Sequence, residues 1–129
     1  MPETKKVLLV EDDPAISDVY TIMLKKANLE VQVMALGQDV INLIQAVQKG
    51  EAQLPDIVVL DLILPDINGL QVLKTIRTTE ATKDMKVFIS TNQEATLLPQ
   101  IDELKPTKYI IKANTTPTQL VELIKAELF

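Results

Sequence analysis

The sequence predicts an α/β protein in which a parallel β-sheet is covered by helices on both faces. Short apolar runs alternate along the 129 residues with longer segments whose apolar residues recur at helical spacing. The short runs are almost solidly Val, Ile and Leu, which is typical of strands buried on both faces. The length and the 47% hydrophobic content suit one compact domain with a sizeable core and exclude a disordered chain.

Five strands and five helices are expected in alternation. The expected strands are residues 6–10 (KVLLV), 31–34 (VQVM), 56–60 (DIVVL), 87–90 (VFIS) and 109–111 (YII). The expected helices are residues 13–27, about 38–48, 70–78, 94–104 and 116–129.

The first two helices carry clear boundary signals. Asp13 followed by Pro14 is a natural cap and first-turn pair, and apolar residues then recur from Ile16 at helical spacing. The second helix contains five aliphatic residues and is expected to end at Gly50, because glycine readily adopts the left-handed conformation that closes a helix.

The later helices differ in how well the sequence defines them. The third is short, and the fourth is disturbed by Pro99, which removes a backbone donor. The fifth begins with Thr116 as the cap, a proline in the first turn and Gln119 at the position that completes a capping box.

Composition excludes several classes of function. The chain has no histidine and no cysteine, which rules out a serine-type triad, a histidine- or thiolate-bound metal, a phosphohistidine and a disulfide framework. The net charge of −5 argues against direct binding of nucleic acid. No apolar run approaches the length of a membrane span, and "MPETKK" lacks a signal-type apolar stretch. We therefore expect a cytoplasmic protein.

Polar side chains gather where the strands end. Glu11, Asp12 and a third acid follow the first strand, Asp61 follows the third, Thr91 the fourth and Lys112 the fifth. The second strand is followed only by an alanine, as expected for a strand at the edge of the sheet. In open parallel sheets ligands bind outside the carboxyl ends of the strands, so these side chains predict a site.

The electrostatics of this edge point to a metal and a nucleophile. Two carboxylates about 4 Å apart repel by about 4 kcal/mol at an effective dielectric near 20, so three need a cation besides Lys112. An oxygen-only ligand set suits Mg²⁺ or Mn²⁺. The carboxylate of Asp61, close to Lys112 and Thr91, is then suited to attack a phosphoryl group.

These residues carry a resemblance to the receiver domain of two-component response regulators. The matching fragments are "LLVEDD", "DLILPDING" with Asp61, Pro65 and Gly69 spaced four apart, Thr91 after the fourth strand, and "YIIK". The resemblance covers almost all of the chain and implies a flavodoxin-like doubly wound (βα)5 fold. In that fold the five-stranded parallel sheet has the order 2-1-3-4-5, with helices on both faces.

The resemblance implies a role for each matching residue at the phosphorylation site. Asp61 corresponds to the phosphoacceptor, Asp12 to the direct Mg²⁺ ligand and Glu11 to its outer-sphere partner. The main-chain carbonyl of Ile63 completes the protein ligands, and Lys112 pairs with the phosphoryl group. The donor is a histidine kinase or a histidine phosphotransfer protein, and the chain catalyses only its own phosphorylation and slow dephosphorylation.

The resemblance also implies a switch. Thr91 turns its hydroxyl toward the phosphoryl group, and Tyr109 moves inward with it, which changes the binding of a downstream protein at the face of the fourth helix, fifth strand and fifth helix. Ser90 is the alternative hydroxyl if the fourth strand ends one residue earlier.

The chain departs from the family pattern near the switch. Ala113 replaces the usual proline after the lysine, which makes a cis bond there unfavourable, and Asn92 replaces a small residue and narrows access. The segment 105–108 (KPTK) replaces a Gly-Ala turn. Ile63 and Gln93 flank the path of attacking water, and an apolar Ile63 predicts slow loss of the phosphoryl group, over minutes or longer.

Three other functions were weighed. A Mg²⁺-dependent aspartyl-phosphate phosphatase generally carries an acid two residues after its nucleophile, where this chain has Ile63. A degenerate receiver that binds partners without phosphorylation remains open because of Ala113 and Asn92. A flavin-binding protein needs a phosphate loop, whereas "EDDPA" is acidic. Residues 1–129 are interpreted as one receiver domain with no output domain visible, either a stand-alone receiver or a fragment of a larger regulator.

Overall fold

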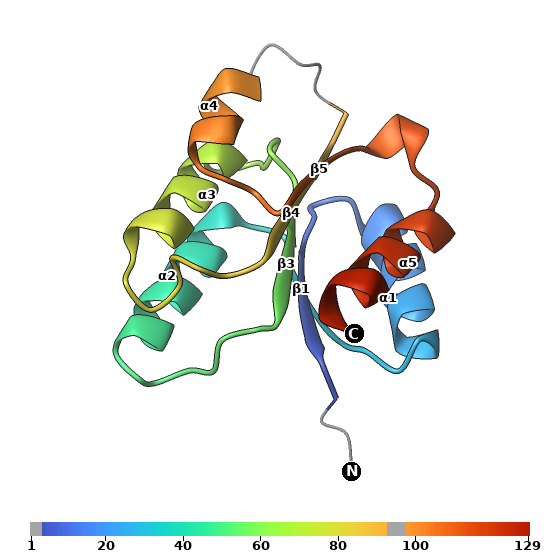
Figure 1. Cartoon of the computed structure of the whole chain (residues 1–129), viewed down its shortest axis with the longest axis horizontal. Helices are drawn as coiled ribbons and strands as arrows, with labels where there is room; N and C mark the ends of the chain where they lie inside the picture. Colours follow the sequence, from blue (N-terminus) through green and yellow to red (C-terminus); the bar gives the residue numbers. More distant parts are fainter. Residues whose placement is uncertain (1–3, 93–97) are drawn as a thin grey trace.

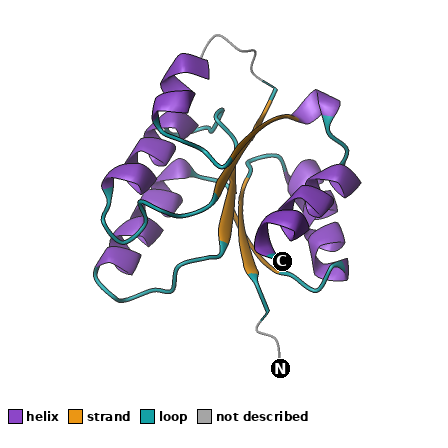
Figure 2. Ribbon diagram, in the orientation of Figure 1, coloured by secondary structure: helices purple, strands orange, loops and turns teal. Residues whose placement is uncertain are grey.

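The computed structural model describes residues 4–92 and 98–129 and contains one five-stranded parallel sheet between two layers of helices (Figures 1 and 2). The strands are β1 (Lys6–Val10), β2 (Glu30–Met34), β3 (Ile57–Leu60), β4 (Val87–Thr91) and β5 (Lys108–Ile111). The helices are α1 (Pro14–Lys26), α2 (Gly37–Gln48), α3 (Gly69–Thr78), α4 (Leu98–Glu103) and α5 (Pro117–Leu128), with a 3₁₀ turn, η2 (Lys112–Asn114), before α5.

The strand order is β2-β1-β3-β4-β5, so the predicted fold, order and edge position of the second strand are confirmed. Helices α2, α3 and α4 cover one face of the sheet, and α1 and α5 cover the other (Figure 1). Within the described residues, no helix combines the length and apolar character that crossing a bilayer requires.

Alternate residues of the strands fill two separate cores. Leu8 and Val10 of β1 pack in the core beneath α2, α3 and α4, whereas Val7 and Leu9 pack in the core beneath α1 and α5. Both sets are essentially fully buried, which explains why the strands are apolar at every position rather than at every second one.

Most predicted boundaries agree with the structure to within one residue. Asp13 caps α1 by accepting a hydrogen bond from the Ala15 amide, and Thr116 forms the predicted capping box with Gln119. Gly50 follows the end of α2 with a φ of 77°, the left-handed conformation expected there.

One predicted boundary of the fourth strand needs correction. β4 extends through Thr91, which is its last residue rather than the first residue after it. The predicted start of the fourth helix at residue 94 lies outside the described residues, which exclude 93–97. The helix described there starts at Leu98 and ends at Glu103, and it includes Pro99 in its first turn, where a missing amide donor has no helical partner to lose.

The β3–α3 loop is held from two directions. At Gly69, any Cβ atom would overlap the backbone of Asp61 and Leu62, so the start of α3 can approach the end of β3 only because this residue is glycine. Asp66 then accepts hydrogen bonds from the amides of Gly37 and Gln38, both at 2.9 Å. Asp66 thereby caps α2, whose own N-cap residue provides no side-chain bond.

Arg77 of α3 holds the end of α4 and the turn that leads from it into β5. Its guanidinium donates to four main-chain carbonyl oxygens at 2.7–3.1 Å, two of them just after α4. Thr107 closes the turn by exchanging hydrogen bonds with Val87 at the start of β4. These side-chain hydrogen bonds stabilise a turn in which Lys105 has a φ of 50°, a left-handed conformation that is unfavourable for a residue other than glycine.

Candidate functional site: an acidic pocket at the carboxyl end of the sheet

The pairing of β1 with β3 brings two carboxylates together. Val10 is in register with Leu60, so Glu11 and Asp61, the next residue of each strand, are neighbours at the carboxyl edge. The exposed fraction is 3% for Glu11 and 8% for Asp61. Two buried carboxylates are costly unless other groups compensate their charge.

Lys112 forms an ion pair with both carboxylates. It begins η2 directly after β5, and its Nζ lies 2.5 Å from Glu11 Oε1 and 2.8 Å from Asp61 Oδ2. Burial by itself would lower the pKa of the Lys112 ammonium, but the hydrogen bonds to Asp61 and Glu11 outweigh it and raise that pKa above its usual value. Lys112 is therefore charged at neutral pH.

Burial raises the pKa of the Glu11 carboxyl group, and the hydrogen bond and charge of Lys112 offset part of that rise. Asp61, which also faces Glu11, pushes the Glu11 pKa in the same direction as burial does. The site thus holds more negative charge than one lysine can balance.

Asp12 completes a cluster of three carboxylates. It is exposed, and one oxygen from each of Glu11, Asp12 and Asp61 lies within 4.8 Å of the other two. Oxygen ligands of this kind and number fit a hard divalent cation, which retains waters in its remaining positions. Ile63 lies two residues after Asp61 and donates its amide to Asp61 Oδ1 at 3.1 Å. The residue is 57% exposed.

The two candidate hydroxyls occupy opposite faces of β4. Thr91 lies two residues after Ile89, which is in register with Tyr109, and both Ile89 and Tyr109 contact the core beneath α2, α3 and α4. Thr91 and Tyr109 therefore share a face of the sheet, and Thr91 is fully buried. Ser90 points to the other face, where its buried Oγ has no hydrogen-bond partner among the described residues.

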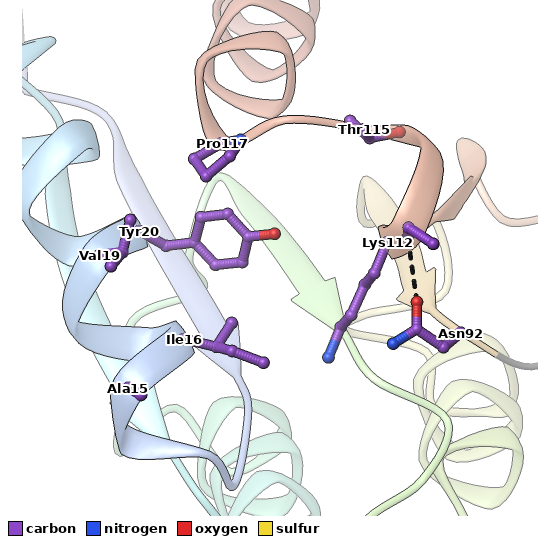
Figure 3. A pocket seen from close by; sticks show the side chains of 9 residues that line it. Ala15, Ile16, Val19, Tyr20, Asn92, Lys112, Thr115 and Pro117 are labelled. Atoms are coloured by element: carbon purple, nitrogen blue, oxygen red, sulfur yellow. Dashed lines mark hydrogen bonds between the residues drawn. The ribbon is translucent and has the colours of Figure 1, made fainter.

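A pocket of about 370 Å³ opens beside Lys112, between α1 and the turn that leads into α5 (Figure 3). Ile16 and Val19 of α1 and Pro117 of α5 form apolar walls. Tyr20 also lines the pocket, and its hydroxyl points from α1 toward the segment that carries Lys112 (Figure 3). Burial raises the pKa of the Tyr20 phenol, so this hydroxyl is neutral at physiological pH.

The sequence did not reveal two polar contacts, those of Asp66 and Asn92, or that Tyr20 lines the pocket beside Lys112. The residue before α2 has no side chain that can accept from the first amides of the helix, which indicates that an acceptor such as Asp66 must come from elsewhere. Asn92 was expected to narrow access, but its Oδ1 also accepts a hydrogen bond from the Ala113 amide at 3.0 Å. Gln93 lies outside the described residues.

The structure thus combines a doubly wound parallel sheet with three carboxylates and a bridging lysine at its carboxyl edge. The family model for the response regulator receiver domain matches residues 7–125. The chain therefore belongs to the response regulator receiver domain family.

Curated proteins similar to this chain include a transcriptional regulator and a cell cycle response regulator. The dual master transcriptional regulator RpaA of Synechocystis is 39% identical over 92 residues, which are 67% of this chain and 33% of RpaA. The cell cycle response regulator CtrA of Brucella ovis is 42% identical over 72 residues, or 56% of this chain and 28% of CtrA. The chain thus spans about a third or less of the length of these relatives.

Solved receiver structures match nearly the whole chain. A CheY-like receiver domain protein from Methanospirillum hungatei superimposes with a TM-score of 0.84 at 25% identity, covering 98% of this chain and 94% of that one. The Mn²⁺-bound form of the response regulator Rcp1 gives 0.80 at 25% identity, covering 95% and 90%.

Proposed function

We propose that this chain is a phosphoryl-accepting signalling module in which Asp61 receives the phosphoryl group. The observation that carries the proposal is the pair of contacts from Lys112 Nζ to Glu11 and Asp61, which gathers groups from β1, β3 and β5 at one point. The donor is a phosphohistidine on a separate histidine kinase or histidine phosphotransfer protein, because this chain has no histidine of its own.

In the proposed step, an oxygen of Asp61 forms a bond to phosphorus as the bond from phosphorus to the histidine nitrogen breaks. The electron pair stays on that nitrogen. Lys112 balances charge on the phosphoryl oxygens, and Thr91 donates its hydroxyl to one of them. Glu11, Asp12, Asp61 and the carbonyl of Ile63 would hold Mg²⁺, which would neutralise further charge on the transferring group.

The proposed output is a change in protein binding. Thr91 is the last residue of β4, and Tyr109 lies on the same face in the neighbouring strand β5. Movement of the Thr91 hydroxyl toward a phosphoryl group would leave room for Tyr109, and a downstream protein would read the change at α4, β5 and α5. Residues 1–129 act as one receiver domain in the cytoplasm, without binding nucleic acid directly.

The test is incorporation of phosphate from acetyl phosphate, measured with and without Mg²⁺ on the wild-type chain and on Asp61→Asn. We expect alkali-labile label, typical of an acyl phosphate, that depends on Mg²⁺ and is absent from Asp61→Asn, whereas acid-stable, Mg²⁺-independent label would overturn the assignment. Asp56→Asn is a matched control, since Asp56 caps the start of β1 far from the carboxyl edge and should not affect labelling. Label that survives in Asp61→Asn would reject the assignment.

A further inference from the structure

We infer that Asn92 is a positioning residue for Lys112, an inference that rests on the proposed phosphoryl-accepting function. The observation is the hydrogen bond in which Ala113 donates its amide to Asn92 Oδ1 at 3.0 Å (Figure 3). Asn92 directly follows Thr91, and Ala113 directly follows Lys112. We call this bond the Asn92–Ala113 latch, and it joins the two segments that carry the hydroxyl and the ammonium of the site.

The latch satisfies a donor that the local backbone leaves free. Ala113 is the second residue of η2, and the first amides of a helical turn have no partner within the turn. A proline at position 113 would have no amide to donate, and a small residue at position 92 would have no acceptor. The two departures from the family pattern are therefore the two halves of one hydrogen bond.

The latch fixes the backbone of Lys112 from one side, and the sheet fixes it from the other. Ile111, just before Lys112, is in register with Thr91 in the pairing of β4 with β5. Ala113, just after Lys112, is bound to Asn92. Both neighbours of Lys112 are thus attached to consecutive residues at the end of β4.

This attachment matters because Lys112 must reach across β4 to the other side of the site. Its Nζ contacts carboxylates that follow β1 and β3, at 2.5 Å and 2.8 Å. A long side chain with four rotatable bonds gains such contacts reliably only when its backbone is held in place. Asn92 does not touch the reacting atoms and acts through the position of Lys112.

The direct test compares Asn92→Leu, which keeps similar bulk but removes the acceptor, with Asn92→Asp, which keeps an acceptor oxygen. Amide hydrogen exchange at Ala113 should become about fivefold faster in Asn92→Leu, equivalent to ~1 kcal/mol for one hydrogen bond, and stay slow in Asn92→Asp. Asn114→Leu, an equally exposed change in the same turn that leaves the latch intact, should not alter it. Unchanged exchange in Asn92→Leu would overturn the latch.

A double-mutant cycle then tests whether Asn92 acts through Lys112. With acetyl phosphate and Mg²⁺, Asn92→Leu should slow phosphorylation of Asp61 about fivefold, the same ~1 kcal/mol. In a Lys112→Ala background, Asn92→Leu should have no further effect. An equal effect in both backgrounds would mean that Asn92 controls access rather than Lys112, and the inference would be wrong.

A second cycle requires no phosphorylation. The four proteins are the wild-type chain, Asn92→Leu, Lys112→Ala and the double variant, and urea unfolding gives the folding equilibrium constant of each. The effect of Asn92→Leu on that constant should differ by about threefold or more between the wild-type and Lys112→Ala backgrounds. Equal effects in the two backgrounds would reject the inference. If the wild-type chain accepts no label, the proposed function fails, while the exchange and urea results still decide whether the latch exists and holds Lys112.

Discussion

Removing the Lys112 ammonium should destabilise the fold in a way that depends on pH. Lys112→Met keeps most of the volume of the side chain but leaves Glu11 and Asp61 buried and uncompensated. One oxygen from each carboxylate lies within 4.8 Å of the others, so at an effective dielectric near 20 each pair of ionised groups repels by about 3.5 kcal/mol or more. Breaking a buried ion pair by removing one partner typically costs about 3–5 kcal/mol.

We expect Lys112→Met to lower the free energy of unfolding by about 3 kcal/mol at about pH 8. This value is at the low end of the range for buried ion pairs because Asp12 and part of Lys112 reach solvent. Such a loss leaves a domain of ordinary stability folded. Burial raises the pKa of Glu11 above its unfolded value of 4.5, so its folded form binds a proton more tightly than the unfolded chain does. The stability associated with this group is therefore largest at low pH and falls as pH rises through the folded pKa.

Without Lys112 the folded pKa of Glu11 rises further, and the range of pH over which stability falls extends upward. The difference between the wild-type chain and Lys112→Met should therefore shrink to about 1 kcal/mol at about pH 5. The assay is urea unfolding followed by circular dichroism in EDTA at both pH values. Adding Mg²⁺ at about pH 8 should restore part of the loss, because the cation replaces the missing positive charge.

Lys125→Met provides the matched control. Lys125 forms a surface pair with Glu122 at 3.9 Å, and both side chains are largely exposed, so its removal should cost less than about 0.5 kcal/mol at either pH. An equal loss at both pH values for Lys112→Met, or a variant as stable as the wild-type chain at about pH 8, would refute the electrostatic reasoning.

Three further outcomes follow from the structure. Arg77→Lys should lower the free energy of unfolding in urea by about 2 kcal/mol, because a lysine cannot reach the four carbonyl oxygens that the guanidinium group binds. A decrease below half of that value would contradict the role of these hydrogen bonds. Asp66→Ala should speed amide exchange at Gly37 and Gln38 selectively, and uniform acceleration throughout α2 would argue against a local cap. The phosphorylated wild-type chain should survive for minutes or longer, since the exposed apolar Ile63 cannot orient water, and a half-life of a few seconds would reject this.

The fold was predictable because its signals are local and mutually consistent. The segments that form β1, β3 and β4 are apolar along most of their length, so each is recognisable as a buried strand. The caps at Asp13 and Thr116 depend only on residues a few positions away. The carboxyl edge followed from the rule that parallel strands place their ends together, so the meeting of Glu11, Asp61 and Lys112 needed only the strand order.

The contacts that were missed join segments far apart in sequence. Asp66 caps a helix that begins 29 residues earlier, and Asn92 binds an amide 21 residues later. The missing cap of α2 indicates that some residue must accept from its first amides, but no local pattern identifies Asp66 or Asn92 as the acceptor, because a backbone amide is present at almost every position. The predicted end of β4 is one residue too early because Thr91 was assigned to the loop, although threonine is a residue that strands favour.

The charges of the proposed site constrain how it can signal. Three carboxylates and one ammonium carry a net charge of −2 when all are ionised, which a divalent cation would cancel. Phosphorylation of Asp61 exchanges one negative charge for about two, so the net charge of the occupied site changes by only about one unit. A change this small, screened at the rim of the sheet, would be a weak long-range signal.

The larger change in the proposed step would be one of geometry, since new acceptor oxygens would appear beyond the end of β3 and would draw donors toward them. The donors nearest the output face sit on Thr91 and Lys112, whose segments the Asn92–Ala113 latch ties together. A movement of Thr91 would therefore be transmitted to the start of η2 and α5 through a hydrogen bond rather than through the field of the phosphoryl group.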